Sequence, residues 1–138
     1  MQRTLLLLCL LIPASLSPKE PPPPRAVRIV GNSQALSRAI ARLEGWGKPG
    51  TLVRRLMNPG ALTYAGQAGA TNEHGYAAFK TELEGWQALR EDLVAKQRRG
   101  MDVPAIARAR CGTDQECDAE RYVVLLCRMV SCPKESDN

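Results

Sequence analysis

One glutamate in this sequence stands where a negative charge is unfavourable. In AIARLEGWGKPG, residues 39–50, an amphipathic run ends at Glu44, and Gly-Trp-Gly follows directly. The carboxyl end of a helix carries partial negative charge, so a carboxylate there costs roughly 0.3–1 kcal/mol. If Trp46 covers the side chain, desolvation disfavours the charged form further. Both effects favour a protonated carboxyl, which is what a general acid needs at neutral pH. The alternative is an ordinary exposed glutamate near a helix end.

Other catalytic arrangements find little support in the sequence. His74, in NEHGY, is the single histidine, so a multi-histidine zinc site is excluded, and this residue is expected at the tip of a hairpin. No Gly-x-Ser-x-Gly elbow, phosphate-binding loop or dinucleotide fingerprint is present. We therefore expect neither a cofactor nor a metal, and the carboxylates remain as candidates.

The elements that must position Glu44 are mostly helical. Apolar residues at helical spacing predict a first helix that begins near Asn32 or Ser33 and ends at Gly45. A turn-rich region follows, with one short helical turn over 51–57 and two strands over 61–64 and 75–79 that form a small hairpin. Three further helices are predicted over residues 81–100, 101–110 and 113–130. The fold class is α+β, mainly α.

Capping residues and apolar stripes delimit the later helices. A capping box of Thr81 and Glu84 begins the longest helix, with Leu83 expected on its buried stripe. Asp102 caps the next helix, and Thr113 with Glu116 caps the last. The last helix is so apolar that we expect the others to bury it.

The chain divides into three segments. Residues 1–17 have an arginine, a short apolar run and small residues, the layout of a secretory signal peptide. Residues 18–26 contain four consecutive prolines and predict an extended tether. Residues 27–138 form the folded domain. The protein is expected to be exported, to the periplasm or outside the cell, with no stable membrane span once the signal is removed.

Four cysteines remain after the signal, and all lie in the last quarter of the chain. An even number of cysteines in an exported protein predicts two disulfides, whose pairing the sequence leaves open. A four-thiolate zinc site is the alternative, but zinc usually takes closer pairs. These residues are Cys111, Cys117, Cys127 and Cys132.

The charge of the chain bears on its partners. The formal net charge is +5, with basic residues spread along the chain. Aromatic residues make up only 4%, too few for a base-stacking surface, so nucleic acid is not expected. For an exported protein, the anionic partners are cell-wall polymers or membrane surfaces, although a surface of ordinary mixed charge explains the same residues.

Several short motifs, taken in order, resemble a known group. EGWGKPGT (44–51), MNPGALTYAGQAG (57–69), GYAAF (75–79) and GWQAL (85–89) resemble phage-virion and secreted lysozyme-like proteins, over about residues 30–130. The resemblance implies a lysozyme-like helical domain and a peptidoglycan glycosidase, either a muramidase or a lytic transglycosylase. In that reading Glu44 protonates the glycosidic oxygen. Met57 before Asn58 and the cysteine-rich C-terminus depart from the pattern of the group.

The resemblance also suggests residues around Glu44. Candidate substrate-binding residues are Trp46, Thr63, Tyr64 and Gln67. A hydrolase needs a second carboxylate about 5–9.5 Å away, and Glu73 is the candidate, because no aspartate lies between residues 26 and 91. A lytic transglycosylase needs no such partner, which favours chemistry by a single glutamate. The alternative function is a catalytically inactive, disulfide-stabilised protein that binds the cell wall or forms part of a virion. The expected partner is peptidoglycan, and the protein is expected to be a monomer.

Overall fold

The computed structural model describes residues 33–112 and 116–132. The predicted signal peptide and tether lie outside these residues, as do Asn32 and Thr113. The described part is mainly helical with one small antiparallel hairpin, as predicted. Its elements are α1 (Ser33–Leu43), α2 (Leu52–Arg55), β1 (Thr71–Glu73), β2 (Tyr76–Ala78), α3 (Glu82–Arg98), α4 (Val103–Cys111) and α5 (Ala119–Val130).

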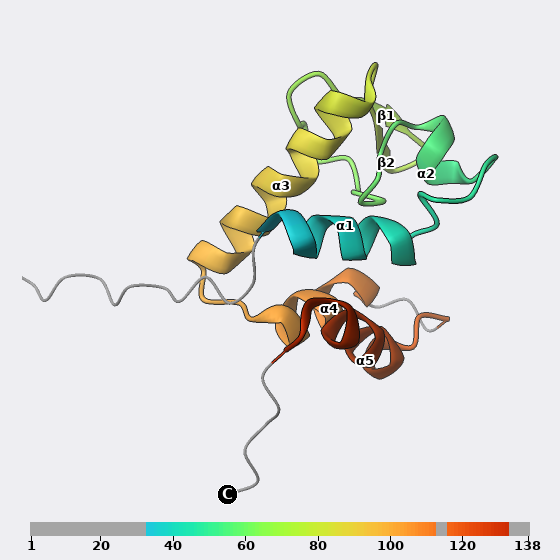
Figure 1. Ribbon diagram of the computed structural model, residues 1–138. Coiled ribbons are helices and arrows are strands. Elements are labelled where there is room, and N and C mark those ends of the chain that lie inside the picture. The colour runs from blue at the N-terminus through green and yellow to red at the C-terminus, as the bar shows by residue number, and fades with distance from the viewer. Residues whose placement is uncertain (1–32, 113–115, 133–138) are drawn as a thin grey trace, which may run out of the picture.

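Helix α1 lies in the middle of the domain. Figure 1 shows α3, α2 and the hairpin on one side of α1, and the α4–α5 pair on the other. Helix α1 contacts both α3 and α5, while α4 packs mainly on α5. The core is therefore built around α1, and its fully buried large side chains include Leu36, Ile40, Leu89, Ile106 and Leu126.

Helix α1 ends as the sequence predicts, at Gly45. Its φ of 88° is the left-handed conformation that glycine adopts without a steric cost. The amide of Gly45 donates to the carbonyl of Arg42 at 3.1 Å, and the amide of Trp46 donates to the carbonyl of Ala41 at 2.9 Å. This pair of bonds is a Schellman motif. It makes Glu44 the last residue before the chain leaves the helix.

The hairpin is real, but its first strand is not where the sequence predicts it. Strand β1 pairs with β2 in the register Glu73↔Tyr76, so only His74 and Gly75 form the turn. Both have positive φ, 50° and 90°, as a two-residue type I′ turn requires. His74 thus lies at the hairpin tip, as expected. The predicted strand 61–64 contributes only an isolated bridge from Thr63 to the other side of β2.

Helix α3 begins with the predicted capping box of Thr81 and Glu84. Its buried stripe differs from the prediction, because Leu83 is 71% exposed in the first turn. The close contact is instead made by Gly85. A Cβ atom there would lie 1.8 Å from the carbonyl oxygen of Met57, so only glycine lets α3 approach the 57–60 turn.

Helices α4 and α5 form the other side of the domain. Asp102 caps α4, as predicted, and accepts a 2.8 Å hydrogen bond from the amide of Ala105. The cap of α5 is Asp118 rather than the predicted Thr113 and Glu116, so this helix begins later than expected. Its burial is also less complete than its composition suggests. Leu126 is fully buried, while Val124, Leu125 and Met129 are exposed.

Two disulfides join the cysteines in neighbouring pairs, Cys111 with Cys117 and Cys127 with Cys132. The structure thereby selects one of the pairings that the sequence leaves open. Within residues 33–112 and 116–132, no group of three or more metal-ligating side chains is present. In the same residues, no helix has the length and apolar character needed to cross a membrane.

Candidate active site around Glu44

The carboxylate of Glu44 is held by two side chains from the far end of the chain. Its Oε1 atom accepts hydrogen bonds from Nε and Nη2 of Arg110, each at 3.2 Å. The same oxygen accepts a hydrogen bond from the hydroxyl of Tyr122 at 2.8 Å. Arg110 Nε also lies 3.2 Å from the Tyr122 oxygen. We call Arg110 and Tyr122 the Glu44 clamp.

The α4–α5 pair brings the two clamp residues together. Arg110 lies in the last turn of α4, next to Cys111, and Tyr122 lies in the first turns of α5. The Cys111–Cys117 disulfide joins the end of α4 to the segment that leads into α5. Helix packing and the covalent bond thus place both donors at the end of α1.

The turn at 58–60 supplies a further anchor for Arg110. The guanidinium Nη2 of Arg110 donates to the carbonyl of Gly60. Asn58 is fully buried and fixes this turn. Its side-chain Nδ2 donates to the carbonyls of Leu62 and Ala77, at 2.9 and 2.8 Å, and its Oδ1 accepts from the amide of Leu62 at 2.9 Å. Arg110 therefore links α4 to the turn on the opposite side of α1.

Charge compensation explains how Glu44 is accommodated at the end of a helix. The side chain of Arg110 is only 8% exposed and that of Glu44 is 22% exposed. An ion pair this shielded from water is stronger than a surface pair. The positive charge that a helix C-terminus favours is therefore present, but it comes from α4 instead of the neighbouring sequence. This cation favours the charged carboxylate, whereas the sequence alone suggested surroundings that favour the protonated form, and the ring of Trp46 packs on Trp86 and Arg54.

Tyr122 is a neutral donor in this site. Burial raises the pKa of its phenol well above the ordinary value, and the negative charge of Glu44 adds to the increase, while Arg110 opposes it. The phenol consequently keeps its proton over the physiological range and donates it to Glu44 Oε1.

The second oxygen of Glu44 is arranged differently from the first. Within the described part of the chain, Oε2 accepts no hydrogen bond, whereas Oε1 accepts three. No buried side-chain oxygen there lacks a partner, so Oε2 is reachable by solvent. Glu44 thus has one restrained oxygen and one that is open.

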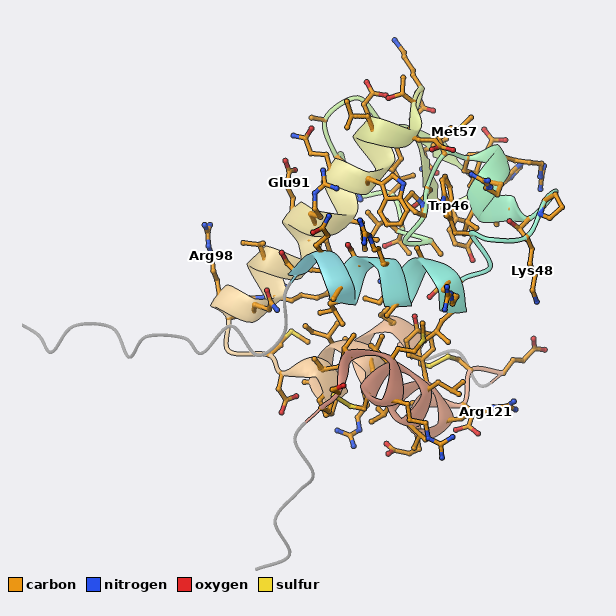
Figure 2. The ribbon with its side chains drawn as sticks, in the orientation of Figure 1. Trp46, Lys48, Met57, Glu91, Arg98 and Arg121 are labelled. Carbon is orange, nitrogen blue, oxygen red and sulfur yellow. A yellow bond between two sulfur atoms is a disulfide. The ribbon has the colours of Figure 1, made fainter. Side chains whose placement is uncertain are left out.

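A groove adjoins the clamp. It consists of two neighbouring cavities of about 550 and 190 Å³ that share Leu62, Ala65, Gln67 and Asp92. The smaller cavity is also lined by Arg110 and so reaches the clamp, while Glu44 itself lines neither cavity. The larger one runs along α3, whose Glu91 side chain is visible in Figure 2.

Two of the candidate substrate-binding residues line this groove. Gln67 lines both cavities and Thr63 lines the smaller one. The amide of Gln67 also closes its own loop, through bonds to Thr63 and Ala65 at 2.7 and 2.8 Å. Trp46 and Tyr64 line neither cavity, and Tyr64 is 39% exposed.

The ring of Trp46 packs within the domain. It meets Trp86 of α3 edge-to-face, with the ring centroids 5.7 Å apart, and the guanidinium of Arg54 lies 4.5 Å from its centroid. Arg54 in turn bonds Glu82 at 2.9 Å. Figure 2 shows Trp46 on the α2 and α3 side of α1. These contacts join the start of the turn-rich region to α3.

The candidate second carboxylate and the groove are separate. Glu73 lies at the end of β1, 3.7 Å from His74 Nε2, and it lines neither cavity. Asp92 is a carboxylate shared by both cavities, and it is paired with Lys96. The structure thus places Asp92 in the groove, where the sequence suggested Glu73.

Sequence reasoning missed the clamp. Arg110 and Tyr122 lie 66 and 78 positions from Glu44, so no local spacing connects them. One feature of the sequence could have indicated Arg110. It directly precedes Cys111, and a disulfide at Cys111 fixes the end of the helix that carries Arg110. The scarcity of aromatic residues also set Tyr122 apart.

Comparison with protein-family models, curated proteins and solved structures finds no match to this chain. The candidate site therefore stands on the geometry around Glu44.

Proposed function

We propose that this protein is an exported peptidoglycan glycosidase with a lysozyme-like fold, in which Glu44 is the general acid. The observation that carries the proposal is the asymmetric carboxylate of Glu44, whose Oε1 atom is held by three donors while Oε2 is open. A general acid must present one oxygen to the bond that breaks and keep its side chain in place. The order of the motifs in the sequence and the two disulfides are compatible with this proposal.

In the proposed reaction, Glu44 gives its proton to the oxygen that joins two sugar residues, and the bond from that oxygen to the anomeric carbon breaks. Glu73 lines neither cavity. The carboxylate of the smaller cavity, which Arg110 also lines, is Asp92, and it is paired with Lys96, while Glu84 and Glu91 line only the larger cavity. This favours a lytic transglycosylase, in which a hydroxyl of the substrate attacks the anomeric carbon and transfers its proton to Glu44. Groove residues Gln67 and Thr63 would contact the glycan.

The test is the chemistry of the products. The oxidised, mature protein is incubated with purified peptidoglycan, and the released fragments are weighed by mass spectrometry. Anhydro ends mark transglycosylation, and reducing ends mark hydrolysis. If the wild-type protein releases fragments with neither kind of end, the proposal that it is an enzyme is wrong.

The second function is binding of the cell wall without cleavage, and the Arg110 ion pair is compatible with it because it gives Glu44 a structural role. A shielded Glu44–Arg110 pair that joins three parts of the fold explains a half-buried glutamate by stability alone. This function predicts that the protein sediments with peptidoglycan and releases no fragments, and that Glu44→Gln changes stability but not sedimentation.

A further inference from the structure

The clamp restricts where a proton on Glu44 can lie. We infer that Arg110 and Tyr122 are positioning residues, which assign the transferred proton to Oε2 of Glu44; this inference rests on the proposed function. Oε1 already accepts bonds from Nε and Nη2 of Arg110 and from the hydroxyl of Tyr122. All three donors point their hydrogen atoms at this oxygen, so a proton added to the carboxylate goes to Oε2.

The position of Glu44 in the fold explains why such a restraint is needed. The residue lies just beyond the end of α1, where its amide still donates to the carbonyl of Ile40 at 2.9 Å and the Schellman bonds of Gly45 and Trp46 follow, so the backbone is fixed but the side chain is not. A glutamate side chain has three rotatable bonds, and its free rotation would move the proton away from the substrate. A misplacement of about 1 Å costs on the order of 10²-fold in rate.

The clamp itself is rigid enough to impose the position. Arg110 is 8% exposed, and its guanidinium is also bound to the carbonyl of Gly60 and lies 3.2 Å from the Tyr122 oxygen. Both residues belong to packed helices, and the Cys111–Cys117 disulfide joins the end of α4 to the segment that leads into α5. The donors therefore remain in place when the proton leaves Glu44, and they stabilise the carboxylate that results.

A positioning role and a purely structural role differ in the kinetic constant that they affect. Tyr122 lines neither cavity of the groove, so loss of its hydroxyl leaves the groove unchanged. Loss of a contact that positions the acid for the chemical step without touching the substrate lowers kcat and leaves KM in place. A structural defect instead lowers the fraction of folded enzyme, which active-site titration or a melting curve reveals.

The experiment measures kcat and KM on soluble peptidoglycan glycan strands for the oxidised wild type, Tyr122→Phe, Arg110→Lys and the control Arg108→Lys. Arg108 lies on the same helix but pairs with the exposed Glu120. We expect Tyr122→Phe to lower kcat about 10- to 100-fold and to leave KM within about twofold of the wild-type value. This decrease is part of the ~10²–10⁴-fold rate acceleration that a general acid contributes. Arg110→Lys, which keeps the charge but loses the forked donors, should also lower kcat at least about tenfold, and Arg108→Lys should match the wild type.

Melting curves show which variants are folded at the assay temperature, and either clamp variant alone is sufficient for the test. An active wild type with unchanged kcat in the folded clamp variants overturns the positioning role and leaves the proposed function standing. A wild type that cleaves no glycan overturns both.

Discussion

The hydroxyl of Tyr122 donates a 2.8 Å hydrogen bond to Oε1 of Glu44, although 78 positions of the chain separate the two residues. The bond joins the first turns of α5 to the end of α1, at the point where Arg110 also reaches the carboxylate. A glutamate that the local sequence leaves next to a helix C-terminus thus receives its partners from the other end of the chain. The following predictions depend on this arrangement.

The phenol of Tyr122 should make stability decrease with pH in the alkaline range. Burial raises its pKa above the ordinary value near 10, so above pH ~10 the unfolded chain loses this proton while the folded chain keeps it. The unfolded state is then favoured, and the free energy of unfolding falls by up to about 1.4 kcal/mol per pH unit. Below pH ~10 the contribution is fully present.

Urea unfolding at pH 9–11.5 measures this slope. We expect the wild type to lose stability more steeply above pH ~10 than Tyr122→Phe, which has no proton to lose at this position. Tyr64→Phe removes an exposed phenol and serves as the control. Equal slopes for the wild type and Tyr122→Phe would show that the phenol is not buried against Glu44.

Loss of the clamp arginine should destabilise the fold. Arg110→Met leaves Glu44 Oε1 and the carbonyl of Gly60 without this donor, in a site little exposed to water. We expect a loss of about 3 kcal/mol in chemical unfolding. The control Arg108→Met breaks an exposed pair with Glu120, and we expect a loss below about 1 kcal/mol.

A double variant isolates the ion pair from the other contacts. In Glu44→Gln/Arg110→Met the charged carboxylate is gone, so the double variant should be more stable than the sum of the single losses indicates. Strict additivity would mean that the two side chains do not interact.

The two disulfides allow a matched comparison. Their closed loops are of nearly equal length, with sequence separations of 6 and 5, so each should contribute about 2 kcal/mol through restriction of the unfolded chain. Of the two bonds, only Cys111–Cys117 joins the end of the helix that carries Arg110 to the segment that leads into the helix of Tyr122. We therefore expect Cys111→Ser/Cys117→Ser to lose more peptidoglycan cleavage than Cys127→Ser/Cys132→Ser at similar stability. Equal losses in both pairs would argue against a specific role for the first disulfide.

Helix α3 lies so close to the 57–60 turn at Gly85 that we expect no side chain to fit at this position. A Cβ atom would lie 1.8 Å from the backbone oxygen of Met57, so Gly85→Ala must displace either α3 or the turn that positions Gly60. We expect a loss of at least about 2 kcal/mol in thermal or chemical unfolding. Gly47→Ala is the control, because nothing lies within 4 Å of its added Cβ. A Gly85→Ala protein as stable as Gly47→Ala would contradict this packing.

Local signals predicted the elements whose formation depends on neighbouring residues. The capping box of Thr81 and Glu84, the Asp102 cap and the Gly45 terminus are all present, because each depends on bonds within a few positions of the chain. The first hairpin strand was misplaced, because the structure closes the hairpin with a two-residue turn at His74-Gly75, and this turn requires at His74 a positive φ that a non-glycine residue seldom adopts. The candidate site was predicted only in part, because the contacts of Glu44 come from distant segments of the chain.

Glu44 itself could be singled out from its unfavourable place at a helix end. Its partners could not, since Arg110 and Tyr122 reach it only after α4 and α5 pack against α1. Nor could the exposure of Leu83, because periodicity places it on the apolar side of α3 while the turn at Met57 packs against Gly85 instead. Contacts between distant segments determine both outcomes.

The central claim is that Glu44 acts as an acid, and one comparison tests it most directly. Wild type and Glu44→Gln are incubated with purified peptidoglycan, and the released fragments are quantified by mass spectrometry, with a melting curve to show that Glu44→Gln is folded. We predict that the wild type releases fragments with anhydro ends and that folded Glu44→Gln loses at least about 10²-fold of this activity. Release of fragments by Glu44→Gln at the wild-type rate would contradict the account.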